Sequence, residues 1–279
     1  MAVVDGEEKL LYSAGNPERK LYARSSMKPI QAVPVVETGA VDFFQFSDAD
    51  LSLCCASHSG EPMHTDRALA ILKSLGLEEE ALQCGTLIPR WQETYYKLDH
   101  PVQQRILQTV NEICDYPSEE IEIGMDGCGV PVHGLPLQAL AHGYTKMTKP
   151  EEMGWAETRV KAVKRVSDAK IAAPEMVGGT GRFCTDFIKA GKGRFFGKAG
   201  AEAVYCIGDK ETGIGIALKI EDGNGRAMYP AAVEVLRQLS LIDDKQTEEL
   251  MNYYRPKLRN ARDEVIGELN PVFTLSAGS

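Results

Sequence analysis

The chain has 279 residues, of which 43% are apolar and 25% charged, with a net charge of -9 at pH 7. This length allows one large domain or two ordinary ones, and the composition is that of a globular protein. The acidic balance and the absence of a Lys/Arg-rich run argue against a nucleic-acid partner, and no apolar run is long enough to span a membrane.

The seven cysteines do not form a disulfide framework. Their number is odd, two are adjacent, and no pair has the C-x-x-C spacing: Cys54, Cys55, Cys84, Cys114, Cys128, Cys184 and Cys206. This pattern is typical of reduced thiols. Residues 1–5 do not resemble a signal peptide. We therefore expect a cytoplasmic protein.

The N-terminal part of the chain predicts two short strands, at residues 2–4 and 10–13, followed by an apolar helix that begins near Ser25. Residues 51–56 have the composition of a buried strand. The polar residues 57–62 then form a turn that opens a helix running to about residue 75.

The middle of the chain predicts mostly helices, and its end predicts further strands at 203–207, 213–220 and 265–275. We see no repeat and no linker. Strands therefore cluster at both ends of a single domain, residues 1–279. We expect an α+β fold, an α/β sandwich whose sheet is formed from both termini, with a helical region inserted between them.

Ser25 and Lys28 are three positions apart, which places them on one face if Ser25 begins a helix. A lysine whose pKa is lowered by burial or by a second cation can take the proton of a serine hydroxyl, so the two form a candidate catalytic pair. The alternative is that Ser25 is an ordinary helix N-cap. Ser167 and Lys170 have the same spacing, but in a charged stretch that predicts a solvated helix.

Two further motifs follow in order along the chain, Ser57-x-Ser59 and Lys198-x-Gly200. Penicillin-recognising enzymes carry S-x-x-K, S-D-N and K-T-G in the same order. In such an arrangement Ser25 attacks a carbonyl carbon, Lys28 accepts its proton, and Ser57 with Lys198 relays protons to the leaving amine. The alternatives are a helix cap for Ser57 and a surface position for Lys198.

Two turns offer polar groups. In the turn at residues 126–129, Asp126 could hold a substrate amine, and Cys128 could be a metal ligand, a polar wall or simply a buried thiol. A lone cysteine does not make a zinc site. The glycine-rich residues 178–181 fit either an anion-binding nest or a flexible loop that enters a helix.

Six segments carry a resemblance to a known family: residues 24–29, 55–61, 84–86, 99–103, 126–131 and 197–202. Together they resemble the L-asparaginase II family of the rhizobial type. The resemblance implies a fold similar to that of serine β-lactamases and glutaminases, a homodimer, and hydrolysis of L-asparagine to aspartate and ammonia. It implies two Ser-Lys pairs, Ser25 with Lys28 and Ser57 with Lys198. Within that reading, the substrate's charged ends would be held by Arg24, His58 and Asp126.

The chain departs from the family at one place. The family has a segment that supplies a cysteine and a lysine to a zinc site, and here residues 95–98 run directly into Asp99. Either the chain is a shortened member or a mobile loop is missing between Leu98 and Asp99, and the abrupt junction favours the missing loop. Of the family's zinc ligands only Cys128 is present.

These observations predict an amidohydrolase that converts L-asparagine to L-aspartate and ammonia through a Ser-Lys acyl-enzyme. Two alternatives stay open. One is the same serine chemistry on another acyl substrate, glutamine or a β-lactam. The other is a relative that binds an amino acid but has lost catalysis.

Overall fold

The computed structural model describes residues 1–81 and 96–278; the motif at 84–86 lies outside these ranges. The strands are β1 (Ala2–Val4), β2 (Leu10–Ser13), β3 (Lys20–Tyr22), β4 (Glu122–Met125), β5 (Pro131–Pro136), β6 (Phe195–Gly200), β7 (Val204–Asp209), β8 (Gly215–Lys219), β9 (Lys257–Arg259), β10 (Val265–Glu268) and β11 (Ser276–Ala277). The helices are α1 (Lys28–Gln31), α2 (Val33–Glu37), α3 (Ala40–Phe43), α4 (Asp48–Cys54), α5 (Pro62–Ser74), α6 (Pro101–Cys114), α7 (Leu137–Thr148), α8 (Glu157–Ala172), α9 (Phe183–Ala190), α10 (Met228–Gln238), α11 (Asp244–Glu249) and α12 (Met251–Tyr254). A short 3₁₀ helix, η1 (Arg24–Met27), precedes α1.

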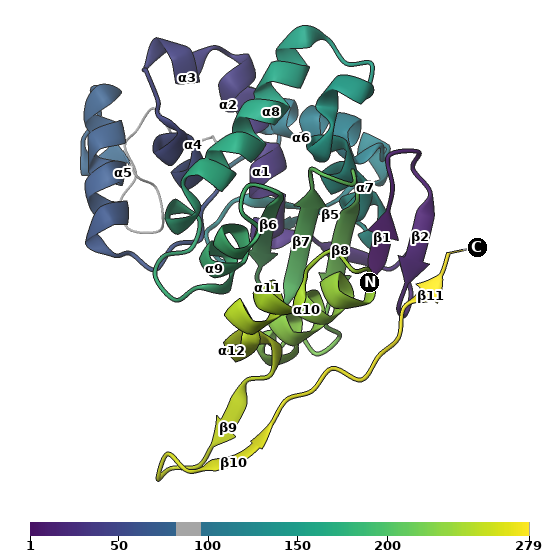
Figure 1. The fold of residues 1–279 in the computed structure, drawn as a ribbon. Coiled ribbons are helices and arrows are strands. Elements are labelled where there is room, and N and C mark those ends of the chain that lie inside the picture. The colour runs from purple at the N-terminus through teal and green to yellow at the C-terminus, as the bar shows by residue number, and fades with distance from the viewer. Residues whose placement is uncertain (82–95, 279) are drawn as a thin grey trace.

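The main sheet is antiparallel and has the strand order β11-β2-β1-β8-β7-β6. Strand β1 lies between β2 and β8, with Val3 opposite Tyr12 on one side and Ile216 on the other. The two ends of the chain therefore meet in one sheet, as Figure 1 shows. This confirms the predicted sheet from both termini with helices inserted between them.

Side chains of the main sheet alternate between two hydrophobic clusters. Val4 and Cys206 belong to one cluster, which includes side chains of α7 and α8. Val3 and Ile207 belong to the other, which includes side chains of α9 and α10. Period-2 alternation in a sheet buried on both faces explains why these strands are almost entirely apolar. The molecule is a sheet with helices on each face.

A smaller three-stranded sheet, β3-β5-β4, leads directly into η1. Tyr22 pairs with Gly134 of β5, and the Ala23 N–H then donates to the His133 carbonyl at 3.0 Å. Strand β5 continues from there to Pro131 and the turn at residues 126–130. This pairing directs η1 and that turn to the same end of the small sheet.

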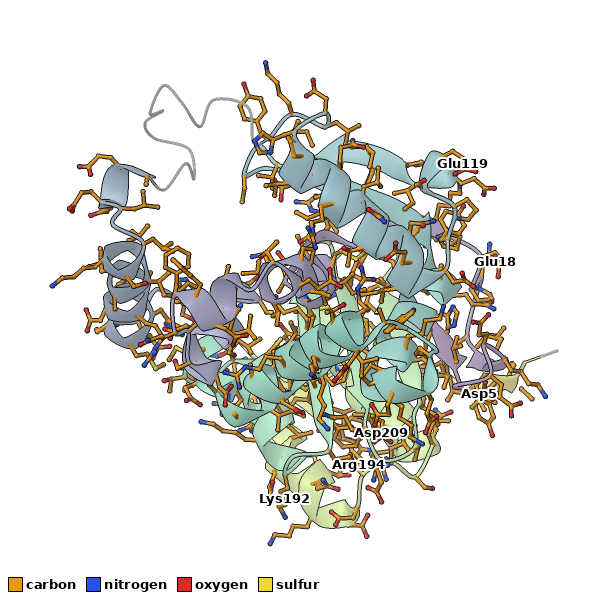
Figure 2. All side chains as sticks on the ribbon, turned by 90° about the horizontal axis from the view of Figure 1, so that it is seen from above. Asp5, Glu18, Glu119, Lys192, Arg194 and Asp209 are labelled. Atoms are coloured by element: carbon orange, nitrogen blue, oxygen red, sulfur yellow. The ribbon has the colours of Figure 1, made fainter. Side chains whose placement is uncertain are left out.

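The edge strand β6 is anchored at its start by an ion pair. Arg194 donates from Nε and Nη2 to the two carboxylate oxygens of Asp209, both at 2.7 Å, and Asp209 is fully buried. Phe195 is opposite Asp209 in the β6–β7 register. Arg194 and Asp209 are labelled side by side in Figure 2. A bidentate pair of this kind fixes the position of the strand that carries Lys198.

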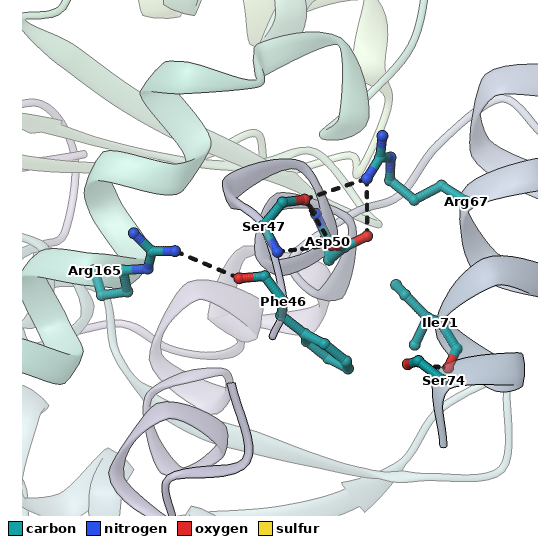
Figure 3. A network of polar contacts seen from close by, with 7 residues as sticks. All are labelled: Phe46, Ser47, Asp50, Arg67, Ile71, Ser74 and Arg165. Atoms are coloured by element: carbon teal, nitrogen blue, oxygen red, sulfur yellow. Dashed lines mark hydrogen bonds and ion pairs between the residues drawn. The ribbon is translucent and has the colours of Figure 1, made fainter. Parts of the chain in front are cut away.

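The prediction of a strand at 51–56 is wrong, because residues 48–54 form α4. Ser47 caps this helix, and Asp50 completes a capping box by accepting from the Ser47 N–H at 2.7 Å. Arg67 of α5 binds Asp50 at 2.9 Å, and Arg165 of α8 donates to the Phe46 carbonyl (Figure 3). A short apolar run of this kind can form either a buried strand or the buried face of a short helix, and here it forms the helix.

The prediction of a closing strand at 265–275 is also wrong. Only β10 (Val265–Glu268) forms there, and it pairs with β9 rather than with the main sheet. Figure 1 shows this hairpin projecting from the body before the chain returns to β2 as β11. No helix in the described ranges is long and apolar enough to cross a membrane.

Candidate active site

Two adjacent serines in η1 have different surroundings. Ser26 is buried, and its hydroxyl donates to the Ala23 carbonyl while its own carbonyl accepts from the Tyr144 hydroxyl at 2.7 Å. Ser25 is partly exposed, and its hydroxyl makes no hydrogen bond to the residues that the structure describes. Ser26 is thus committed to the fold, and Ser25 is the serine that remains accessible.

The backbone of η1 begins in an unusual conformation. Arg24 has φ 53°, a left-handed value that a non-glycine residue adopts only when its surroundings impose it. Strand β6 packs closely against this turn, since a Cβ on Gly200 would lie 2.6 Å from the Ala23 carbonyl oxygen. Arg24 itself donates to Glu202 Oε1 at 2.6 Å. Close packing and this ion pair hold η1 against the end of β6.

Ser57 lies between two lysine amines. Lys198 Nζ donates to Ser57 Oγ at 2.9 Å, and Lys28 Nζ lies 3.5 Å from the same oxygen. Lys28 Nζ also donates to the Ala56 carbonyl, and Lys198 Nζ to the Ala199 carbonyl at 2.7 Å. Three of the four residues predicted to be catalytic therefore meet at one hydroxyl, although they come from distant parts of the chain.

Burial changes the acidity of Lys198. The residue is 1% exposed, and loss of hydration lowers the pKa of its amine to about 7. The buried Cys184 acts in the opposite direction, whereas the charges of Lys28 and Lys170 lower the pKa further. An amine with this pKa can both accept and release a proton at neutral pH.

The segment that carries Ser57 is paired with the glycine-rich loop. The N–H groups of Ser57 and Ser59 donate to the carbonyls of Val177 and Gly178 at 3.1 and 3.0 Å. The Glu61 carboxylate accepts from the Thr180 N–H at 2.8 Å and from its hydroxyl at 2.7 Å. The loop at 178–181 thus binds an internal carboxylate, and it fixes Ser57 rather than presenting a nest to an external anion.

His58 lies beside this loop. Its ring stacks on His64 with a centroid separation of 4.6 Å, and its Nδ1 accepts from the Gly60 N–H at 3.0 Å. Burial, followed by the charges of His64 and Lys28, lowers the pKa of His58. His58 is therefore a neutral ring at neutral pH.

Asp126 and Cys128 lie in the β4–β5 turn. Asp126 Oδ1 accepts from the Cys128 N–H at 2.8 Å, so part of its carboxylate closes the turn. The Cys128 thiol is free and exposed. Among residues 1–81 and 96–278, no group of three metal-binding side chains includes Cys128.

Lys170 is the residue that the sequence reasoning missed. The predicted solvated helix at 167–170 is wrong, because Ser167 and Lys170 are both fully buried in α8. Lys170 Nζ donates to the Gly197 carbonyl at 3.0 Å, next to Lys198 in β6, and burial lowers the pKa of its amine. Its average surroundings in sequence are polar, but Val163, Val166 and Ala169 mark a buried face that includes it.

A cavity of about 1040 Å³ lies between α6 and α8 and is lined by residues such as Arg105, Trp155 and Arg159. None of the predicted catalytic residues lines it. The largest group of predicted catalytic residues therefore lies outside this cavity, at the Ser57 hydroxyl.

The structure thus brings a serine hydroxyl and two buried or half-buried amines together on a mixed α/β fold. Comparison with protein families gives the narrower assignment. The model of the family L-asparaginase II matches residues 1–94 and 90–271. The chain belongs to the L-asparaginase II family. A search of curated proteins found no match.

The two matched segments meet at residues 90–94, close to the junction where the sequence departs from the family pattern. In the structure, Leu98 and Asp99 lie in a turn that is closed by the His100 N–H donating to the Lys97 carbonyl at 3.0 Å.

Proposed function

We propose that this protein hydrolyses the side-chain amide of L-asparagine to L-aspartate and ammonia, through an acyl-enzyme on Ser25. The observation that carries the proposal is the Ser57 hydroxyl held between Lys28 and Lys198, in a chain of the L-asparaginase II family. The accessible Ser25 lies in the turn against which β6 packs.

The reaction needs one proton shared between the two amines. Ser57 can pass a proton from Lys28 to Lys198, which leaves Lys28 neutral to accept the Ser25 proton as Oγ attacks the amide carbon. The charged Lys198 then returns a proton through Ser57 to the leaving nitrogen, and ammonia departs. At the acyl-enzyme stage Lys28 holds the Ser25 proton and Lys198 is neutral, so Lys28 first passes that proton through Ser57 to Lys198. A water then loses a proton to the neutral Lys28 as it attacks the ester, that proton restores the Ser25 hydroxyl, and the proton on Lys198 returns through Ser57 to Lys28.

The remaining polar groups fit recognition of an amino acid. Arg24 pairs with Glu202, whose side chain is exposed. When this ion pair opens, the Arg24 guanidinium can bind the substrate carboxylate. Asp126 has one carboxylate oxygen in the β4–β5 turn, and the other can accept from the substrate amine. His58 is neutral and stacked on His64, and its Nδ1 already accepts from the Gly60 N–H, so its Nε2–H can donate one hydrogen bond to the substrate.

We extend the proposal to a serine β-lactamase-like fold, to a homodimer, and to a cytoplasmic location, as the family resemblance implies. The family's zinc does not fit the residues described here. Cys128 is an exposed thiol without two further ligands from the described part of the chain, and zinc sites need three or four. No step of the proposed reaction uses a metal.

Ammonia release from L-asparagine tests the proposal, with Ser25→Ala compared against Ser26→Ala. Loss of turnover in Ser25→Ala with a normal fold, and a trapped acyl group on the peptide that contains Ser25, would support the mechanism. An acyl group on the peptide that contains Ser57 would instead make Ser57 the nucleophile. Full activity of Ser25→Ala would remove Ser25 from the reaction.

Parallel assays with L-glutamine and a β-lactam separate the substrate alternatives. Faster turnover of either one than of L-asparagine would replace the proposed substrate. Binding of L-asparagine by calorimetry without turnover would identify the protein as a relative that has lost catalysis.

A further inference from the structure

Three ionisable side chains from three separate elements converge on the side of the molecule that holds the β1–β2 hairpin. Glu8 lies in the turn between β1 and β2, Asp115 is the C-cap residue of α6, and His142 lies in α7. One ligand atom from each lies within 4.8 Å of the others. This group is separate from Ser57 and its lysines, and the proposed reaction does not use it.

The imidazole of His142 carries the strongest evidence that the group has a ligand. His142 is 7% exposed, yet its Nε2 has no hydrogen-bond partner among the described residues. Nε2 lies 3.3 Å from Glu8 Oε1 without the alignment that a hydrogen bond requires. A cation bound to both this nitrogen and the Glu8 carboxylate would supply the partner that Nε2 lacks among the described residues.

The carboxylates are available to a cation at that position. Glu8 and Asp115 are exposed, with side-chain exposures of 52% and 60%. They line a cavity of about 220 Å³, together with residues that include Glu18, Cys114, Tyr116 and His142. Glu18 is labelled on this side of the molecule in Figure 2. Glu18, a third acidic side chain in the cavity lining, adds negative charge there.

Lys146 is the cation nearest to the group. Its Nζ lies 3.6 Å from Glu8 Oε1 and 3.9 Å from Asp115 Oδ2. Charge-assisted hydrogen bonds are about 2.7–2.9 Å long, so the ammonium balances the two carboxylates without bonding closely to either. A divalent cation would compete with the Lys146 ammonium for the oxygens of Glu8 and Asp115. Repulsion between the cation and the ammonium would weaken binding of the cation.

We propose that Glu8, Asp115 and His142 bind a first-row divalent cation of the Mn²⁺ to Zn²⁺ series. One imidazole nitrogen with two carboxylates is a ligand set that such ions accept, at about 2.0–2.2 Å for zinc. The ion ties the β1–β2 hairpin to α6 and α7. Its role is structural, since α7 is the helix that packs on β1 and β8.

Binding of Mn²⁺ to the full chain tests the site, because Mn²⁺ favours oxygen and nitrogen ligands over the chain's cysteines. We expect the free-ion electron paramagnetic resonance signal to fall on addition of protein. We also expect the unfolding midpoint to rise with Mn²⁺ concentration. Both effects should be lost in Glu8→Gln, which changes only an exposed side chain, and in Asp115→Asn, which retains the left-handed C-cap conformation.

Glu7→Gln is the matched control in the same turn and should bind as the unchanged protein does. Lys146→Met should bind at least tenfold more tightly, because it removes the competing charge. No uptake of Mn²⁺ at millimolar concentration, or unchanged uptake in both Glu8→Gln and Asp115→Asn, would overturn the proposal. So would Co²⁺ absorption that shows a thiolate band and disappears in Cys128→Ser. Activity is not a readout, so these results do not depend on the proposed function.

Discussion

Replacing Lys198 with methionine separates a catalytic lysine from a structural one. Methionine keeps most of the length and volume of the buried side chain but removes the amine that binds Ser57. We expect asparagine turnover to fall by about 10²–10⁴-fold, the usual contribution of a general acid–base group. We expect the stability of the protein at pH 7 to rise.

The rise follows from the pKa of Lys198, which the fold lowers from 10.5 to about 7. At about 1.36 kcal/mol per unit, holding this amine in the folded state costs roughly 5 kcal/mol at neutral pH. The variant loses the hydrogen bonds to Ser57 Oγ and the Ala199 carbonyl, which together offset roughly 1–3 kcal/mol. The net gain is therefore roughly 2–4 kcal/mol, or about 3–7 °C in the unfolding midpoint.

The gain should depend on pH in a defined direction. Between pH 7 and 10.5 the unfolded chain binds the Lys198 proton and the folded chain does not, so the unchanged protein becomes more stable as pH rises. The advantage of Lys198→Met should therefore shrink above pH 7. Urea unfolding at pH 7 and pH 9.5 measures it, with the exposed Lys189→Met as control. A less stable variant that retains turnover would refute the reasoning.

Three further predictions concern the same site. The acid limb of kcat/KM for asparagine should have its midpoint at about pH 7, where the Lys198 proton is lost, and a pH-independent rate from 5 to 8 would contradict this assignment. In Lys170→Met, loss of the neighbouring charge should raise the pKa of Lys198 and move that limb to higher pH; a helix-packing role alone would leave it in place. Gly200→Ala should reduce turnover at least tenfold, since the new Cβ meets the Ala23 carbonyl oxygen at 2.6 Å and displaces η1, whereas Gly6→Ala, with nothing within 4 Å, should leave it unchanged.

The sequence predicted the central strands β1, β7 and β8 well because these strands are buried on both faces. A short, continuous apolar segment such as 203–207, bounded by turn residues, has few alternatives to a central strand. The pairing of Val3 with strands at both ends of the chain followed from the clustering of strands near the termini.

The wrong strand at 51–56 shows where apolar content misleads. Six apolar or small residues fit either a buried strand or one face of a short helix, and periodicity cannot separate them at that length. The Ser47–Asp50 capping box was a readable signal for the helix, since it satisfies N–H groups that a strand would pair elsewhere.

The order of the motifs along the chain predicted that Ser57 meets Lys28 and Lys198. The packing that brings these residues together could not be predicted from the sequence. Which of two adjacent serines is accessible depends on the left-handed backbone at Arg24 and on the close approach of Gly200, neither of which leaves a signal in a single sequence. Lys170 was overlooked because its neighbours in sequence are charged, while its neighbours in space lie on β6.

The two fully buried lysines share a feature that explains their acidity. In the described part of the chain, Lys170 and Lys198 donate to backbone carbonyls or to Ser57, and neither has a carboxylate partner. Lys210, which directly follows β7, pairs with Asp168 of α8 instead. A carboxylate beside Lys198 would stabilise its charged form and raise its pKa out of the neutral range. Carbonyl and hydroxyl partners orient the amine without that charge, so the site retains a base at neutral pH at the expense of stability.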